Sequence, residues 1–287
     1  MNILTNKNLL CSLLLFILTG CNRINNIIYS PQITPKDFLS SQPWISIKFG
    51  SFEFVLCQPT STLIVFFLGV FTLFAGYKLL SDLNKQKSRL AWGVGLLLTG
   101  AGAIIAGTSY QAFGYEIKCM GRDFCTWTSW WEIIYLFLTS LGLNIFLIGS
   151  AFSSAKEGFR KIMIVYAISN SIIYSALLIF GALIPVKFLV SFEFLVLLSA
   201  PTLFFLIGLH YRFYLKHKDI SDKNLRNTWL IIIPVALAYY VWLRINLTQT
   251  LWQKGIWFSE NDLLHIGMIW WVYYVKVNLP KNLKDLI

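Results

Sequence analysis

Charged side chains are scarce in this chain of 287 residues: they make up 13% of it, whereas hydrophobic residues make up 56%. Soluble domains have about 25% charged and about 45–50% apolar residues. Too few charges are therefore present to cover a surface that faces water. The same composition excludes a disordered chain, a coiled coil and a small secreted scaffold held by disulfides. It predicts an integral membrane protein.

Acidic residues are the rarer of the two charge types, with 13 Asp and Glu against 24 Lys and Arg, for a net charge of +11. Such an excess can indicate nucleic-acid binding, but no motif of a nucleic-acid-binding fold is present. Membrane proteins concentrate Lys and Arg in cytoplasmic loops, close to anionic lipid headgroups. We therefore expect membrane lipid as the partner, and no nucleic acid.

The chain has no internal repeat and no polar stretch long enough for a soluble domain. Its apolar segments have about the 17–25 residues that a tilted membrane helix needs, and lipid cannot satisfy an open backbone. We therefore expect an all-α membrane protein, a seven-transmembrane helix bundle over residues 61–277 that follows a signal peptide. The expected spans are 61–80, 90–108, 130–152, 162–184, 188–210, 228–244 and 261–277.

The first twenty residues have the pattern of a signal peptide, with Lys7 before an apolar run at 9–18 that is too short to span a membrane. The run ends in Leu18-Thr19-Gly20-Cys21, which resembles a bacterial lipobox. This resemblance implies cleavage after residue 20 and lipidation of Cys21 as the first mature residue. The alternatives are a plain signal peptide and an uncleaved first helix. Each of them places residues 22–60 outside the cytoplasm.

Seven spans threaded from this outer start place residues 278–287 in the cytoplasm as a tail. Lys and Arg are most frequent in the segments that this topology places inside, at 78–89, 156–161, 212–226 and 276–284. This distribution follows the positive-inside rule. We expect a protein of the bacterial inner membrane, with its N-terminus outside and its C-terminus in the cytoplasm.

Several features predict how the spans pack. The second span is rich in Gly and Ala, which permits close helix contact and predicts a central position, although a flexible helix has the same composition. Pro185, Pro201 and Pro234 predict helix ends or kinks. Residues 45–55 form either a short amphipathic strand or an interfacial stretch, and Trp92 is expected in an inner aromatic belt.

Of the five cysteines, Cys11 lies in the predicted signal peptide and Cys21 is the predicted lipidation site, so three others remain in the mature chain. Cys119 and Cys125 share one loop that the topology places outside the cytoplasm, where a disulfide can form. Two free thiols are the alternative. No histidine is near, and the spacing differs from that of paired zinc ligands, so this loop is not expected to bind zinc. Cys57 stands alone before the first span.

Ionisable groups inside spans are costly, and they are functional candidates for that reason. These residues are Glu132, Glu193, Asp262 and His265, with Glu260 at the edge of the seventh span. The other two histidines, His210 and His217, fall at the cytoplasmic end of the fifth span, where we expect interfacial residues.

Asn261, Asp262 and His265 share one helical face, at spacings of three and four residues. A carboxylate beside a histidine can orient the imidazole and fix its tautomer, which suits a ligand or an acid–base pair. A buried polar clamp between helices is the alternative reading.

The topology collects polar residues from the outer ends of four spans in one layer. They are Cys57, Gln58, Thr60, Ser61, Ser109, Gln111, Glu116, Glu132, Glu260, Asp262 and His265. This layer predicts a site near the outer face, but a polar rim without a pocket fits the same sequence.

The span layout and the segment Asn261-Asp262-Leu263-Leu264-His265 resemble the CREST superfamily, which includes alkaline ceramidases and progestin/adiponectin-type receptors. The resemblance implies a zinc-dependent lipid-amide hydrolase whose serine matches Ser109. Phe113 and Glu260 stand where histidine ligands are expected, so a site of three histidines cannot form. Zinc would then require a mixed ligand set that includes carboxylates, with His265, Asp262 and Glu260 as the first candidates and Glu132 or Glu116 as alternatives.

This incomplete ligand set leaves three functions open. The first is a non-catalytic or lipid-binding CREST-like bundle. The second is a hydrolase of lipid amides or esters, in which Asp262 or Glu132 takes a proton from metal-bound water and Ser109 donates to the oxyanion. A metal-free version of it uses Asp262 and His265 as the acid–base pair. The third is a transporter, which the missing repeat and the few mid-membrane charges disfavour.

Overall fold

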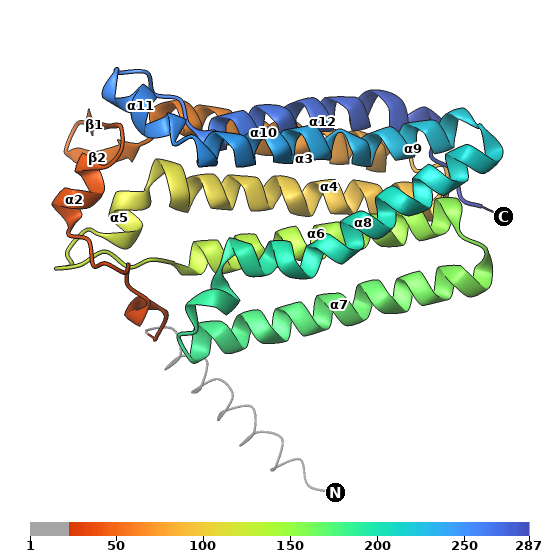
Figure 1. The fold of residues 1–287 in the computed structure, drawn as a ribbon, viewed down its shortest axis with the longest axis horizontal. Coiled ribbons are helices and arrows are strands. Elements are labelled where there is room, and N and C mark those ends of the chain that lie inside the picture. Colours follow the sequence, from red (N-terminus) through yellow and green to blue (C-terminus); the bar gives the residue numbers. More distant parts are fainter. Residues whose placement is uncertain (1–22, 287) are drawn as a thin grey trace, which may run out of the picture.

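The computed structural model describes residues 23–286, so the predicted signal peptide and Cys21 lie outside the described residues. The chain is mostly helical, and six of its helices are long and apolar enough to cross a membrane. They are α3 (Pro59–Ser81), α4 (Lys87–Ala106) with the π-helical turn η2 (Gly107–Ala112), α6 (Trp130–Ser154), α7 (Glu157–Leu183), α8 (Phe192–His217), and α9 (Ile220–Leu230) continued by α10 (Ile232–Arg244). These helices run lengthwise in one bundle (Figure 1). The protein is therefore an integral membrane protein.

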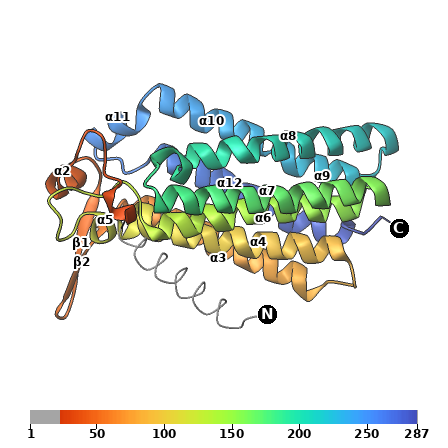
Figure 2. The same ribbon diagram turned by 90° about the horizontal axis from the view of Figure 1, so that it is seen from below.

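A seventh long helix, α12 (Glu260–Asn282), lies in the same bundle against α3 and α10 (Figures 1 and 2). It has 23 residues, as many as α3, but it carries two acidic residues in its first turn and Lys276 and Lys281 further along. It is not among the six helices of the described chain that have the length and composition of a span. The seven helices expected from the sequence are all present as bundle elements, and six of them have the composition of a span.

Helix α4 packs between α3 and α6 through glycines on both of its faces. A Cβ atom on Gly100 would lie 2.9 Å from the Leu73 nitrogen and 3.0 Å from the Gly69 oxygen of α3. On the other face, a Cβ atom on Gly95 would lie 3.2 Å from the Gly142 oxygen of α6. Because only glycine permits backbones this close, the second span is central, as its composition predicts.

The centre of the bundle is an aromatic cluster. The ring of Trp92 lies 4.8 Å from that of Phe146 and 5.6 Å from that of Trp229, and Trp271 packs against both of these partners. Trp92 is fully buried. The expectation that it belongs to an inner aromatic belt is wrong, because its ring faces neighbouring helices and not the membrane boundary.

The prolines have different effects. The sixth apolar segment breaks at Ile231, between α9 and α10, since Pro234 has no N–H to donate to the carbonyl of Leu230. Pro185 follows the end of α7. Pro201 lies inside the continuous helix α8, so the end or kink predicted there is not a helix boundary.

Short elements cover the end of the bundle where the described chain begins (Figure 1). They are η1 (Arg23–Asn26), α2 (Pro35–Ser40), the strands β1 (Trp44–Phe49) and β2 (Phe52–Cys57), α5 (Gly114–Lys118), η3 (Lys187–Val190) and α11 (Leu247–Gln253). The two strands form an antiparallel hairpin that projects from the bundle (Figure 2), with Trp44 opposite Cys57. The all-α prediction is therefore wrong for this segment. Residues 45–55 form two strands joined by a turn at residues 50–51, where the sequence analysis expects one short strand or an interfacial stretch.

The chain before α3 is held against the loop between α5 and α6. The amide of Cys125 donates to the Ile33 carbonyl at 3.0 Å, and that of Trp127 donates to the Ile27 carbonyl at 2.7 Å. Cys119 and Cys125 form the expected disulfide. Cys57 is a free thiol buried in the same hydrophobic cluster. Burial raises the pKa of the Cys57 thiol to about 11, so it stays protonated at neutral pH.

The C-terminus closes the opposite end of the bundle. Helix α12 continues to Asn282, and the chain after it is docked on neighbouring helices. The Asp285 carboxylate accepts hydrogen bonds from the Lys87 and Ser88 amides, each at 2.8 Å, and Arg160 donates to the Leu286 carbonyl at 2.7 Å. In the segment predicted as a tail, residues 278–282 are the last residues of α12, and Asp285 caps the start of α4.

Candidate ligand-binding cavity

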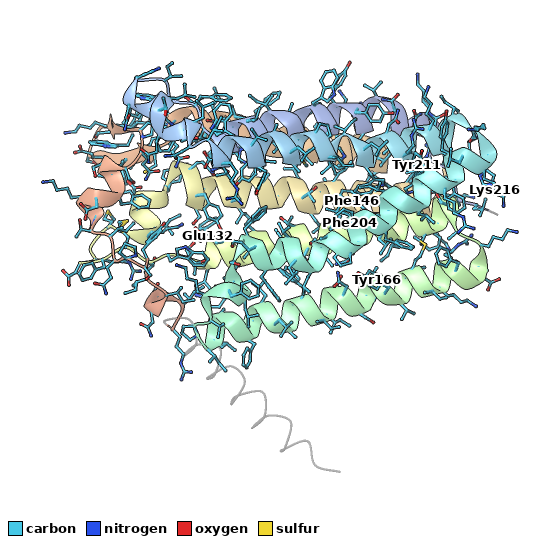
Figure 3. The ribbon with its side chains drawn as sticks, in the orientation of Figure 1. Glu132, Phe146, Tyr166, Phe204, Tyr211 and Lys216 are labelled. Atoms are coloured by element: carbon cyan, nitrogen blue, oxygen red, sulfur yellow. A yellow bond between two sulfur atoms is a disulfide. The ribbon has the colours of Figure 1, made fainter. Side chains whose placement is uncertain are left out.

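The polar residues expected to share one layer do lie at the same end of the bundle. The starts of α3, α6 and α12 and the turn η2 meet there, beneath the short covering elements (Figure 1). Figure 3 shows Glu132 near this end of α6 and Phe146 near its middle. These polar residues are not one cluster, however. They form two buried networks and the wall of a cavity.

The first network joins Ser109, Glu132 and Lys118. The Ser109 hydroxyl donates to Glu132 Oε1 at 2.9 Å and lies 2.8 Å from the Ser129 hydroxyl. The Lys118 ammonium forms an ion pair with the same carboxylate, and the two side chains are 4% and 1% exposed. Burial by itself would lower the pKa of Lys118, but the Glu132 carboxylate outweighs burial and raises it, so the ammonium stays charged.

Ser109 and Glu132 are two of the residues that the sequence predicts to be catalytic. The structure brings Ser109 and Glu132 together, but neither side chain lines the cavity. The Ser109 hydroxyl is already donated to Glu132. Since the carboxylate is also paired with Lys118, the two groups act as a buried link between η2, α5 and α6.

The second network starts α12. Asp262 Oδ2 accepts hydrogen bonds from the Ser259 amide at 2.6 Å and from the Ser259 hydroxyl at 3.0 Å, which makes a capping box. The Ser259 hydroxyl lies 3.5 Å from that of Ser61 on α3. Glu260 accepts a hydrogen bond from Thr248 of α11. These contacts match the polar clamp that was the alternative reading of this segment.

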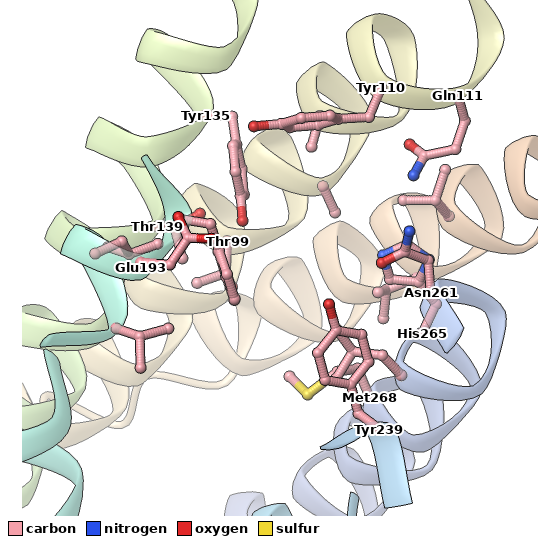
Figure 4. A pocket seen from close by; sticks show the side chains of 18 of the residues that line it. Thr99, Tyr110, Gln111, Tyr135, Thr139, Glu193, Tyr239, Asn261, His265 and Met268 are labelled. Atoms are coloured by element: carbon pink, nitrogen blue, oxygen red, sulfur yellow. The ribbon is translucent and has the colours of Figure 1, made fainter. Parts of the chain in front are cut away.

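His265 lies one turn further along α12, and its ring faces the cavity (Figure 4). Its Nδ1 atom has no hydrogen-bond partner within residues 23–286, so the predicted pair with Asp262 is not formed. Nowhere in this part of the chain do three or more His, Cys, Asp or Glu side chains gather in a group that could hold a metal ion. In the described structure, Ser259 and Thr248 hold the carboxylates of Asp262 and Glu260, and these two side chains do not gather with His265.

The cavity has a volume of about 840 Å³ and is lined by residues of α3, η2, α4, α6, α8, α10 and α12. It extends from Gln42 and Gln58 at the covered end to Phe146, Trp229 and Trp271 in the aromatic core. Most of its wall is apolar. Its size lies in the range of about 300–1,000 Å³ that is typical of small-molecule sites.

One side of the cavity carries neutral polar groups. Figure 4 shows Gln111, Asn261 and His265 close together there. Gln58, the residue before α3, adds to this side and donates to Gln42 at 2.7 Å. The Oε1 atoms of Gln58 and Gln111 and Nδ1 of His265 are buried without a partner in the described residues. Buried polar atoms are normally hydrogen-bonded, so these three have capacity for a ligand.

Gln58 also has an uncommon backbone conformation. Its φ is 42°, in the left-handed region, at the position that precedes α3. Such a conformation costs a non-glycine residue about 1–2 kcal/mol. Strained residues of this kind cluster at ligand sites, which agrees with the position of the Gln58 side chain in the cavity wall.

The other side of the cavity carries an acid. Glu193, from the first turn of α8, lines the cavity together with Thr99, Thr139, Tyr110 and Tyr135, and Figure 4 labels all five. The two tyrosine rings meet edge to face at 6.0 Å. Among the residues that the structure describes, none forms an ion pair or hydrogen bond with the Glu193 carboxylate.

The π-helical turn η2 directs one of three successive side chains to the buried network with Glu132 and the other two to the cavity. Ser109 joins the buried network with Glu132, whereas Tyr110 and Gln111 line the cavity. A π turn inserts one residue into a helix and often occurs at functional sites. Without it, α4 would continue at its usual spacing and would present a different set of side chains.

Tyrosines are the cavity residues that the sequence analysis misses. Tyr110, Tyr135 and Tyr239 all line the cavity, and the available signal was a hydroxyl inside an otherwise apolar segment. The expectation for His210 is also wrong. It is fully buried in α8, with neither ring nitrogen bonded within the described chain, whereas His217 contacts Asp222 at 2.9 Å near the end of the helix.

A bundle of apolar helices that is covered at one end and contains a large, mainly apolar cavity defines an integral membrane protein with a candidate ligand site. Residues 60–281, more than half of the chain, match the model of a family of unknown function, DUF6962, and the chain belongs to this family. Comparison with curated proteins and with solved structures finds no significant match. The resemblance to the CREST superfamily stays a prediction.

Proposed function

We propose that this protein binds a lipid-like molecule with one hydrocarbon chain in the cavity. The observation that carries this proposal is the division of the cavity wall, which is polar at the covered end and apolar near Phe146, Trp229 and Trp271. The polar head would take the hydrogen bonds that Gln58, Gln111 and His265 offer. Burial of the chain would supply about 25 cal/mol for each Å² of apolar surface.

Binding is favoured over hydrolysis by the state of the predicted catalytic residues. Ser109 and Glu132 are engaged with each other and with Lys118. Asp262 caps α12 and does not contact His265. A hydrolase would need a free nucleophile or an activated water beside the cavity, and these groups are committed to structural contacts.

The membrane arrangement is part of the same proposal. We propose that α12 is the seventh span, and that the covered end faces the outside of a bacterial inner membrane. The basic segments at 78–89, 156–161, 212–226 and 276–284 support this orientation, because the helix ends that carry them lie at the opposite end of the bundle. The signal peptide and lipidated Cys21 would then tether the covering elements to the same outer face.

The test is binding of a defined neutral amphiphile, a monoacylglycerol, to the detergent-purified protein, measured by native mass spectrometry. Ala200 lines the cavity, and Ala200→Phe would fill part of its volume. Ala176 is exposed on α7 and does not line the cavity, so Ala176→Phe is the matched control. We expect Ala200→Phe to weaken binding at least about tenfold, a change of about 1.4 kcal/mol, and Ala176→Phe to bind like the wild type. Equal binding by all three proteins would contradict the proposal.

A further inference from the structure

The charges on the cavity wall are few and unbalanced. Lys118 and Glu193 are the lining side chains of formal charge among the described residues. Lys118 is neutralised by Glu132, which lies behind the wall. Glu193 therefore leaves the cavity with one negative charge that has no counter-charge from the described chain.

The Glu193 side chain is exposed, and its carboxylate has no ion pair or hydrogen bond within residues 23–286. An unpaired carboxylate at the wall of a mainly apolar cavity favours a ligand group of opposite charge. The neighbouring Thr99 hydroxyl is donated to backbone carbonyls of its own helix, at 3.0 Å and 3.2 Å.

Aromatic faces surround the same space. Tyr110 and Tyr135 lie near Glu193, and Tyr239 is across the cavity from it (Figure 4). Cations are attracted to the faces of tyrosine and tryptophan rings, and the attraction is stronger where water is excluded. A carboxylate together with aromatic rings is the chemistry that recognises an ammonium group.

We infer that the cavity selects an amphiphile with a cationic ammonium head, which pairs with the carboxylate of Glu193. This inference rests on the proposed function and adds the charge of the ligand to it. Amphiphiles of net negative charge are disfavoured, because the wall offers no unpaired Lys or Arg side chain within residues 23–286 and Glu193 would repel them. The hydrocarbon chain occupies the apolar part of the cavity, near Trp229 and Trp271.

The experiment compares three ligands of equal chain length on the purified full chain: an alkylamine, an alkyl alcohol and an alkyl carboxylate. Affinities come from native mass spectrometry at neutral pH. We expect the amine to bind about tenfold more tightly than the alcohol, and the carboxylate to bind most weakly. Equal affinities for the amine and the alcohol would overturn the inference and leave the proposed function intact. Failure of all three to bind would instead refute the proposed function.

Two variants separate the carboxylate from general effects. Glu193→Gln keeps the size of the side chain and removes its charge, so we expect it to lose the preference for the amine while it binds the alcohol like the wild type. Glu157→Gln makes the same change on an exposed residue of α7 outside the cavity, and it is expected to keep the preference. An unchanged preference in Glu193→Gln would overturn the inference even if the wild type favours amines.

A fourth ligand identifies the source of the ammonium group. Lysophosphatidylethanolamine of the same chain length presents the amine beside a phosphate. Binding as tight as that of the alkylamine, with loss in Glu193→Gln, assigns the site to a lipid headgroup. Weak binding of this lipid together with tight binding of the alkylamine assigns it to a simple amine. Both results keep the pairing with Glu193.

Discussion

At the scale of single residues, the most consequential contact is the ion pair between Lys118 and Glu132. Both side chains are almost fully buried, and Ser109 donates a further hydrogen bond to the carboxylate. Lys118 also lies 4.7 Å from the centre of the Tyr110 ring, in the cavity wall. The pair therefore fixes three elements around the covered end of the cavity.

Removing the negative member of this pair should be severe. Glu132→Gln leaves a buried ammonium without a counter-charge, and loss of one partner of a buried pair costs about 3–5 kcal/mol. We expect a marked drop in the apparent melting temperature of the protein in detergent. The matched control is Glu157→Gln, which breaks an exposed pair with Lys161 and should have little effect.

A second variant separates the buried charge from loss of shape. In the double substitution Lys118→Met with Glu132→Gln no charge remains buried, so part of the lost stability should return. If Glu132→Gln alone melts like the wild type, the pair does not have the structural role assigned to it here.

At the scale of elements, the close packing of α4 against its neighbours depends on glycines, which have no Cβ atom. The Gly100 position faces the α3 backbone at Leu73 and Gly69. Gly100→Ala should push the two helices apart and lower the free energy of unfolding by about 1–3 kcal/mol. Gly208→Ala in α8 is the control, because nothing lies within 4 Å of its added Cβ atom. Thermal melting of both variants in the same detergent tests this, and equal destabilisation would contradict it.

The C-terminal segment 283–286 is held on α4 by the Asp285 carboxylate, and the pH dependence of this contact can be tested. Burial alone would raise the pKa of Asp285, but hydrogen bonding by Ser88 and the Lys87 amide outweighs it and lowers the pKa overall. A carboxyl with a lowered pKa stabilises the fold above its unfolded pKa of about 3.9, and this contribution is lost as the pH falls through the folded value. Docking should therefore persist at neutral pH and weaken under acid conditions.

Asp285→Asn should imitate the acid state at neutral pH. It removes the charge at the start of α4, where a capping carboxylate is worth about 0.5–2 kcal/mol. The measurement is the rate of proteolysis after residue 282, which we expect to rise in the variant. The difference between variant and wild type should shrink as the pH is lowered, and a difference that is independent of pH would argue against this role.

At the scale of the whole molecule, the orientation in the membrane can be measured with cysteine labels. Lys254 is exposed at the covered end and Lys156 at the opposite end. A membrane-impermeant maleimide applied to intact cells should label Lys254→Cys directly, and Lys156→Cys only after permeabilisation. Cys57 is buried, and Cys119 and Cys125 are joined, so the unsubstituted chain serves as the blank. The opposite pattern of labelling would invert the proposed topology.

Local features of the sequence were sufficient for the membrane class, the positions of the long helices, the central place of α4 and the Cys119–Cys125 disulfide. Each of these depends on composition or spacing within one segment, where apolar length, small residues or loop position act directly. For residues 45–55 the sequence predicts a short strand as one of two alternatives, but not the hairpin that the structure shows. The polar residues of the predicted layer do lie at one end of the bundle, because membrane depth follows from position along each span.

Only the tertiary structure decided what the polar residues at that end do. Asp262 has Ser259 three residues before it, and this local partner captured a carboxylate that was expected to serve His265. Glu132 meets Lys118 across a loop, and Trp92 meets Trp229 across the bundle. The cavity is defined by side chains of several helices, and the exposure of Glu193 to it follows from where α8 crosses. Contacts between segments far apart in the chain depend on how helices pack, and the pattern of any single segment does not contain that information.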